Sequence, residues 1–173
     1  AVLWSSSGDG LFSLATDIQP TYTPGHNDSL AGVVTLKITG TGSDGCLMTN
    51  VVDSMTLTMI DSAQAQAGPN QQVCKGSILD INTSTAGSYS SLVWTTSGSA
   101  GTLSSTSTVY TTYTPSVADK TAGAVTLTLT AKGIAPCPDK SSSINVTLFD
   151  QPIIDVGNDT SLCTWKQFTL NQT

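Results

Sequence analysis

The segment AVTLTLTAKG, residues 124–133, alternates apolar side chains with threonine, so that Val125, Leu127 and Leu129 are each separated by one threonine. Successive side chains of a β-strand point to opposite faces, so this period of two predicts a strand with one buried face and one hydroxyl-lined face. The segment SINVTLF, residues 143–149, alternates in the same way. Both segments therefore predict strands of a sheet that buries one face.

Similar short runs precede these two segments and are separated by clusters of Gly, Pro and Asp. They are SILDIN at 77–82, SSLVWTT at 90–96 and STVYTTYT at 107–114. About seven short strands in a unit of about 90 residues are typical of an immunoglobulin-like β-sandwich. The chain contains no Glu and no Arg, which removes two of the best helix formers and favours an all-β fold.

The sequence repeats itself, with four segments recurring in the same order at a period near 90 residues. These pairs are 2–13 with 92–104, 20–42 with 111–133, 53–61 with 142–150, and 67–74 with 156–163. The repeat predicts tandem sandwiches of about 90 residues each.

The chain is out of phase with this repeat, which favours a window on a longer tandem array. The alternative is a head-to-tail filament in which residues 151–173 complete residues 1–61 of the next copy. Residues 1–62 are predicted to form a partial repeat that lacks its first strands, and residues 63–150 a complete repeat. Residues 151–173 are predicted to hold the first strands of a further repeat, at Ile153–Val156 and Phe168–Leu170. The side chains expected in the cores are Trp4, Trp94, Leu127, Leu129, Ile144 and Val146.

Composition excludes several classes of protein. Only 10% of residues are charged, the net charge is −6, and 51 of the 173 residues are Ser or Thr. Nucleic-acid binding needs clustered basic residues, so a nucleic-acid partner is not expected. The apolar runs are too short to cross a bilayer, so membrane insertion is not expected either.

The four cysteines allow three pairings. The repeat favours a disulfide within the complete unit, between Cys74 and Cys137, because the first strand is expected to share an end with the loop that holds Cys137. The alternative that also respects the repeat joins Cys46 with Cys74 and Cys137 with Cys163. Disulfides of this kind predict an extracellular location.

With the favoured pairing, Cys46 and Cys163 would pair outside the chain or across copies. We expect Cys163 of one copy to reach Cys46 of the next, with Phe168 and Leu170 beside Trp4. The partners expected are therefore neighbouring repeats or copies of the same chain, arranged head to tail.

Few residues carry candidate chemistry. His26 is the only histidine and is expected in an exposed turn, so no enzymatic activity is predicted. Asp9 and Asp28 are weak candidates for a Ca²⁺ site, because turn carboxylates can ligate this ion, and no other cofactor is expected. Trp165 stands in a turn beside Lys166 and is expected to pack against an adjacent unit, with contact to a surface glycan as the alternative.

The stretch from Trp4 to Gly10, PTYTP at 20–24 and VTLKIT at 34–39 resemble the PKD-type (polycystic-kidney-disease-type) sandwich domain. The chain is similar to the Cys-containing, Thr-rich PKD-like repeats of giant surface proteins of Bacteroidetes-type bacteria, including gliding-motility adhesins. The second unit departs from this pattern, because Gly-Ser-Ala-Gly at 98–101 replaces Gly-Asp-Gly. Any role of Asp9 therefore does not carry over to that unit.

The resemblance implies O-glycosylation in an Asp-Ser-apolar pattern, for which Ser29, Ser54 and Ser62 are the candidates. It also implies a bacterial cell-surface location. The function expected is a structural stalk or filament module of an adhesin, built of disulfide-stapled sandwiches placed end to end. The alternative is a carbohydrate-binding accessory module of a secreted enzyme.

Overall fold

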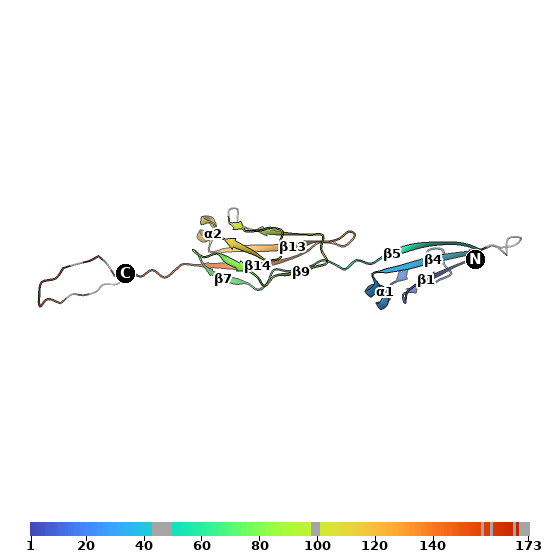
Figure 1. Ribbon diagram of the computed structural model, residues 1–173, viewed down its shortest axis with the longest axis horizontal. Coiled ribbons are helices and arrows are strands. Elements are labelled where there is room, and N and C mark those ends of the chain that lie inside the picture. Colours follow the sequence, from blue (N-terminus) through green and yellow to red (C-terminus); the bar gives the residue numbers. More distant parts are fainter. Residues whose placement is uncertain (43–49, 98–100, 157, 160, 168, 170–173) are drawn as a thin grey trace. The chain divides into compact units, whose positions relative to one another are not determined.

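The computed structural model describes residues 1–42, 50–97, 101–156, 158–159, 161–167 and 169. The chain divides into two compact units, Ala1–Ser62 (unit one) and Ala63–Thr173 (unit two). Strands β4 and β5 run side by side in unit one, and β13 and β14 do so in unit two (Figure 1). Apart from two short helices, the regular structure of the described residues is β, which confirms the predicted all-β fold.

The larger sheet of unit two has the strand order β10-β13-β14-β7. Its strands are β7 (Gln71–Cys74), β10 (Ser91–Thr96), β13 (Ala124–Lys132) and β14 (Lys140–Phe149). All neighbours are antiparallel except β7, which runs parallel to β14. Since β7 precedes the others in sequence, the first part of the unit closes the edge that the last strand would leave open.

A second sheet has the order β11-β12-β8, and a short ladder joins β6 to β9. These strands are β6 (Gln64–Gln66), β8 (Leu79–Ile81), β9 (Thr85–Gly87), β11 (Thr102–Leu103) and β12 (Thr111–Thr114). Strands in this order on two sheets that share one core form an immunoglobulin-like β-sandwich.

The alternating strands bury their apolar faces in one core. Leu127, Leu129 and Val146 are fully buried, Ile144 is 1% exposed and Trp94 is 2% exposed. The hydroxyl faces of the same strands form cross-strand hydrogen bonds, such as that of 2.8 Å between Thr128 Oγ1 and Ser143 Oγ. The period of two therefore divides the residues as the sequence predicts.

Unit one contains the counterpart of part of this sandwich. One sheet has the order β1-β4-β5, and a hairpin joins β2 to β3. The strands are β1 (Val2–Ser6), β2 (Leu11–Phe12), β3 (Tyr22–Thr23), β4 (Val33–Thr41) and β5 (Asn50–Thr58). Trp4 lies opposite Ile38 in this sheet, as Trp94 lies opposite Leu129 in unit two.

Two helices that the sequence pattern did not predict occupy equivalent places, α1 (His26–Ala31) and α2 (Val117–Ala122). Each ends at a glycine in the left-handed conformation, Gly32 at φ 69° and Gly123 at φ 75°. Each also carries a buried aspartate in its first turn. Local capping therefore forms a short helix where strand periodicity alone predicts a turn.

Beyond β14, the described residues of 151–173 form neither a strand nor a helix. The strand predicted at Ile153–Val156 is not formed, because no strand of the described residues pairs with this segment. Phe168 and Leu170, predicted as a second strand here, lie outside the described residues. In the part of the chain that is described, neither helix has the length and apolarity needed to span a membrane.

Candidate functional site

The site with most binding potential is the incompletely covered side of unit one. Strand β5 is the edge strand of its sheet, whereas its counterpart β14 pairs on its second side with β7. Likewise β3 pairs only with β2, whereas β12 pairs with both β11 and β8. Unit one thus presents backbone groups at two edges that unit two satisfies with β7 and β8.

The two units also differ in how many apolar side chains they bury. Among the described residues, unit two has fifteen buried apolar side chains, whereas unit one has only Val34 and Leu36. Met55, at the position of Ile144, is 52% exposed, and Trp4 is only half-buried. Trp4 is therefore not a fully buried core residue as predicted, because the described residues of unit one include no counterpart of β6 and β7 to cover it.

A cavity of about 90 Å³ lies on this uncovered face, lined by Trp4, Leu36, Ile38, Asp53, Ser54 and Met55. In unit two the equivalent face is covered by the segment around β6, which packs on β13 and β14. Ala65 and Ala67 of this segment belong to the core. The backbone N–H of Ala67 donates to Ser142 Oγ at 3.1 Å, and Asp53 holds the position of Ser142 in unit one.

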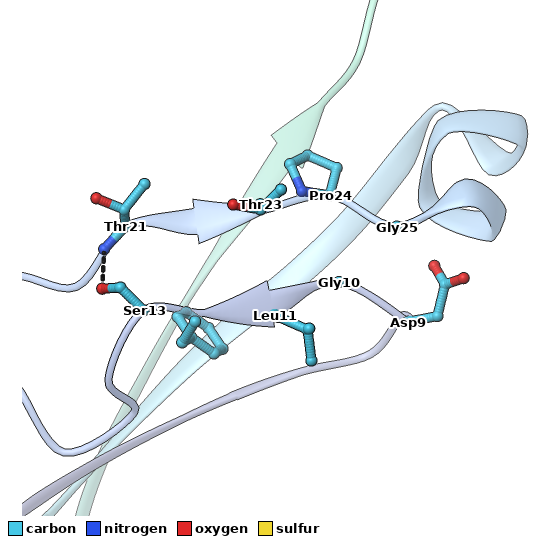
Figure 2. A pocket seen from close by; sticks show the side chains of 9 residues that line it. Asp9, Gly10, Leu11, Ser13, Thr21, Thr23, Pro24 and Gly25 are labelled. Carbon is cyan, nitrogen blue, oxygen red and sulfur yellow. Dashed lines mark hydrogen bonds between the residues drawn. The ribbon is translucent and has the colours of Figure 1, made fainter.

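A second cavity, of about 420 Å³, lies along the β2–β3 hairpin. Figure 2 shows that two adjacent segments line it, residues 9–13 and residues 21–25. The hairpin is held there by the Thr21 N–H, which donates to Ser13 Oγ at 3.1 Å. This trough is open and its lining is predominantly apolar, with Leu11 and Pro24 on opposite strands.

At one end of the trough the Asp28 carboxylate accepts four hydrogen bonds. Its donors are the backbone N–H groups of Asp9, Gly10 and Gly25, and the Tyr22 hydroxyl at 2.6 Å. The Tyr22 hydrogen bond, followed by the backbone donors, lowers the pKa of Asp28 below its usual value. Asp28 is only 2% exposed, and its oxygens are committed to these donors.

Asp9 caps the helix that carries Asp28. Its two carboxylate oxygens accept the backbone N–H groups of Asn27 and Asp28, each at 3.1 Å. Helix α1 begins after Gly25, which has no side chain to perform this role. Asp9 and Asp28, the two weak Ca²⁺ candidates, therefore turn their oxygens towards N–H and O–H donors rather than towards a common point, which is the geometry of a structural network.

Unit two repeats this network with a different cap. Tyr113 donates to Asp119 at 2.7 Å, and Ser116 Oγ accepts from the Asp119 N–H at 3.1 Å. Burial raises the pKa of Asp119, but hydrogen bonds from the Ser116 hydroxyl and then Tyr113 outweigh it and leave the pKa lowered. Burial and Asp119 together raise the pKa of Tyr113.

Sequence reasoning did not identify these Tyr–Asp pairs. It took Asp28 as a turn carboxylate and a weak Ca²⁺ candidate. The available signal was that each follows a tyrosine by six residues, at positions 91 residues apart in both cases.

The predicted disulfide between Cys74 and Cys137 is wrong for this structure. Cys74 and Cys137 are not joined to each other. Cys74 lies opposite Phe149 at the end of β14, whereas Cys137 precedes the start of β14 at Lys140. The nine residue steps of β14 separate these ends by roughly 30 Å, and a disulfide needs Cα atoms within about 7 Å.

The error lies in the assumed direction of the first strand. Because β7 is parallel to β14, Cys74 reaches the opposite end of the unit from the β13–β14 loop. The predicted pairing of Cys163 with Cys46 of another copy stays a prediction. Cys46 itself lies outside the described residues.

The remaining candidate residues lie on the surface. Ser29, Ser54 and Ser62 are exposed, as modification would require, and His26 is the exposed first residue of α1. Trp165 is 98% exposed in a turn with φ 69°, and it lines neither of the two cavities described above. Within the described ranges, no three His, Cys, Asp or Glu side chains gather as a metal site.

Comparisons with known proteins add little to this geometry. No family model matches the sequence, and no curated protein matches it. The chain is similar to a crystal structure of human protocadherin-24 EC1-2, form II, with a TM-score of 0.40 and 13% identity over 87% of this chain and 83% of that one. At this level the likeness carries no argument, and the immunoglobulin-like assignment rests on the strand order of unit two.

Proposed function

We propose that the chain is a structural module of an extracellular stalk, in which β-sandwiches follow one another end to end. The stalk would belong to a bacterial cell-surface adhesin or filament, as the resemblance to PKD-like repeats implies. The observation that carries the proposal is the position of the two ends of unit two.

The chain enters unit two at one end of the sandwich and leaves it at the opposite end. At the beginning, the Ala67 N–H bonds to Ser142 near the start of β14. The chain leaves the sandwich after Phe149, at the end of β14, where the Phe149 carbonyl accepts a hydrogen bond from the Lys75 N–H. The seven residue steps from 142 to 149 span about 23 Å of strand, so each such unit would advance the chain by about the length of the sandwich.

The surface of unit two supports the same proposal. The outer face of β13 and β14 bears a ladder of hydroxyl and amide pairs, including Thr130 with Ser141 at 2.9 Å. The ion pairs of unit two include Lys75 with Asp150 and Lys132 with Asp139. Short polar side chains bonded to one another give a hydrated surface with little charge, which suits a spacer better than a binding face.

Small-angle X-ray scattering of one, two and three fused copies of the chain tests this function. A stalk predicts that the largest dimension increases linearly with copy number. A compact particle would grow only about 1.3-fold in radius for each doubling of length. Growth of that smaller kind would overturn the proposal.

A matched control separates stiffness from mere extension. A Gly-Ser linker inserted between Ser62 and Ala63 should broaden the distribution of distances without changing the fold of either unit. If the fusions scatter identically with and without this linker, the direct connection between units contributes no order, and the chain is not a stalk of the proposed kind.

A further inference from the structure

We propose that unit one is completed by residues 153–163 of a second copy of this chain, which add a parallel strand along β5 and cover the cavity beneath Trp4. This goes beyond the proposed function, which needs only that sandwiches follow one another along a chain. Strand addition to an open sheet edge is a general mode of peptide recognition.

The donor segment has the sequence of the strands that unit one lacks. Residues 64–74, which hold β6 and β7, correspond to residues 153–163 at a separation of 89 positions. The turn after each segment is also alike. The Ser77 N–H bonds to the Cys74 carbonyl at 2.9 Å, and the Lys166 N–H bonds to the Cys163 carbonyl at 3.2 Å.

The donor carries apolar side chains at the positions that are covered in unit two. Ile154 is 84% exposed, Val156 71% and Leu162 51%. Their counterparts are Ala65 and Ala67, which are 6% and 0% exposed, and Val73, which is half-buried. Three apolar side chains at buried positions of the repeat thus have no core to enter in their own unit.

The acceptor has the matching edge in a fixed register. Val34 pairs with Leu57 as Val125 pairs with Val146, so β5 corresponds to β14 residue by residue. In unit two, Leu148 lies opposite Val73 and Phe149 opposite Cys74. The same register brings Leu162 to Met59 and Cys163 to Ile60.

The cavity of about 90 Å³ lies where the start of the donor would pack. In unit two this place is taken by Ala65 and Ala67, beside Trp94 in the same core. Ile154 and Val156 would fill it against Trp4 and Met55. The Val156 N–H would then face Asp53, which replaces the Ser142 acceptor of unit two.

Chain connectivity favours a second copy over the same one. The segment leaves unit two beside Phe149, whereas unit one is joined to the other end, about 23 Å away, at Ala63. Only Gln151 and Pro152 separate Asp150 from Ile153, and three residue steps span at most about 10 Å. Unit one of the same molecule would have to fold back along unit two to accept the donor, so the proposal commits to a second copy.

Cysteine crosslinking of the full chain tests the register. In a chain with Cys46, Cys74 and Cys137 replaced by serine, Ile60→Cys should form a disulfide with Cys163 of another copy. Oxidised glutathione accepts the two electrons, the two thiols lose their protons, and the S–S bond links the copies. Non-reducing electrophoresis should show a ladder of dimers and larger species. The matched control, Thr56→Cys, lies four residues earlier in the chain, on β5, and should give little product.

Two outcomes overturn the proposal. A disulfide confined to the monomer would mean that the segment folds back on its own chain. Equal crosslinking of Ile60→Cys and Thr56→Cys would mean that the copies meet without register.

Sedimentation of the chain with its native cysteines kept reduced gives a second, independent measurement. Leu162→Asp should weaken self-association about tenfold or more, because a half-buried leucine is replaced by a charge. Ser161→Asp, at the position of the exposed Gln72, should leave it nearly unchanged. The proposal would be overturned if the unmodified chain did not self-associate, or if the two variants weakened self-association equally. Neither result would affect the scattering test of the stalk.

Discussion

Trp4 and Trp94 occupy the same place in the two units, yet Trp94 is 2% exposed while Trp4 is only half-buried. Their indole N–H groups donate to equivalent carbonyls, those of Asp17 at 3.1 Å and Thr108 at 3.0 Å. The local structure is therefore the same, and only the covering differs. The comparison teaches that alternation decides which face points inward, whereas strands from the first part of the repeat decide whether that face is buried.

Trp94→Ala is expected to have the largest effect, a loss of about 3–5 kcal/mol in the stability of unit two, because it empties a large, well-packed site. Trp4→Ala should cost clearly less, since Trp4 has fewer neighbours to lose. Calorimetry of the full chain measures both losses, with each transition assigned to the unit whose variant shifts it.

The matched control for this pair is Thr128→Ala, on the outer face of β13, which should change stability by no more than roughly 0.5 kcal/mol. Equal losses from the two tryptophan variants would break the comparison, because they would mean that unit one is as well covered as unit two. If addition of a second copy's segment raises the cost of Trp4→Ala at high protein concentration, the comparison is sharpened.

The sequence predicts the strands of this fold well and its chain directions less well. Period-two alternation places Leu127, Leu129, Ile144 and Val146 in the core because the face of a strand depends only on residue parity. The direction of β7 depends instead on which edge of the finished sheet is open. Alternation carries no information on this, so the Cys74–Cys137 pairing was placed at the wrong end.

For the residues of the candidate site as well, the sequence predicts some features and not others. The repeat indicates Asp28 and Asp119 as structural residues, yet not their tyrosine partners, because the hydrogen bonds depend on how a hairpin folds over a helix. The uncovered face of unit one was predictable, since the missing strands could be counted from the repeat. The cavity there and its lining by Asp53 were not, because they depend on side-chain packing.

The Tyr–Asp pairs are expected to have the next largest effect. Tyr113→Phe should destabilise unit two by about 1.5–3 kcal/mol, since a buried carboxylate loses a donor. Tyr22→Phe should cost less, because Asp28 keeps three backbone donors. Urea unfolding of the two variants measures this difference, and a larger loss from Tyr22→Phe would contradict it.

The pKa shifts give these pairs a pH dependence on both sides of neutrality. The pKa of Asp119 is lowered by folding, so its contribution is present above the usual value of 3.8 and is lost as the pH falls further. The pKa of Tyr113 is raised, so its contribution is lost as the pH rises above 10.0. Melting temperatures between these limits should be nearly flat, and Asp119→Asn should weaken the acid dependence of unit two.

The smallest expected effect concerns the two helix caps, which solve one problem in different ways. In unit two, Ser116 at the start of α2 accepts the Asp119 N–H with its own side chain. In unit one, Gly25 holds that position, and Asp9 reaches the same backbone groups from the preceding turn. A side chain at Gly25 is unfavourable there, because its Cβ would lie 2.8 Å from the Asp9 carbonyl carbon.

Asp9→Ala and Ser116→Ala should therefore each cost about 1 kcal/mol, each in its own unit only, as loss of a helix cap usually does. Asp9→Asn should retain part of the capping, since an amide oxygen can still accept one N–H. Gly25→Ser should not rescue Asp9→Ala, because the backbone of residue 9 still occupies the space a side chain needs. Calorimetry of the full chain separates the two units, and a rescue by Gly25→Ser would show that the caps are interchangeable and that the close approach of the two turns is not fixed.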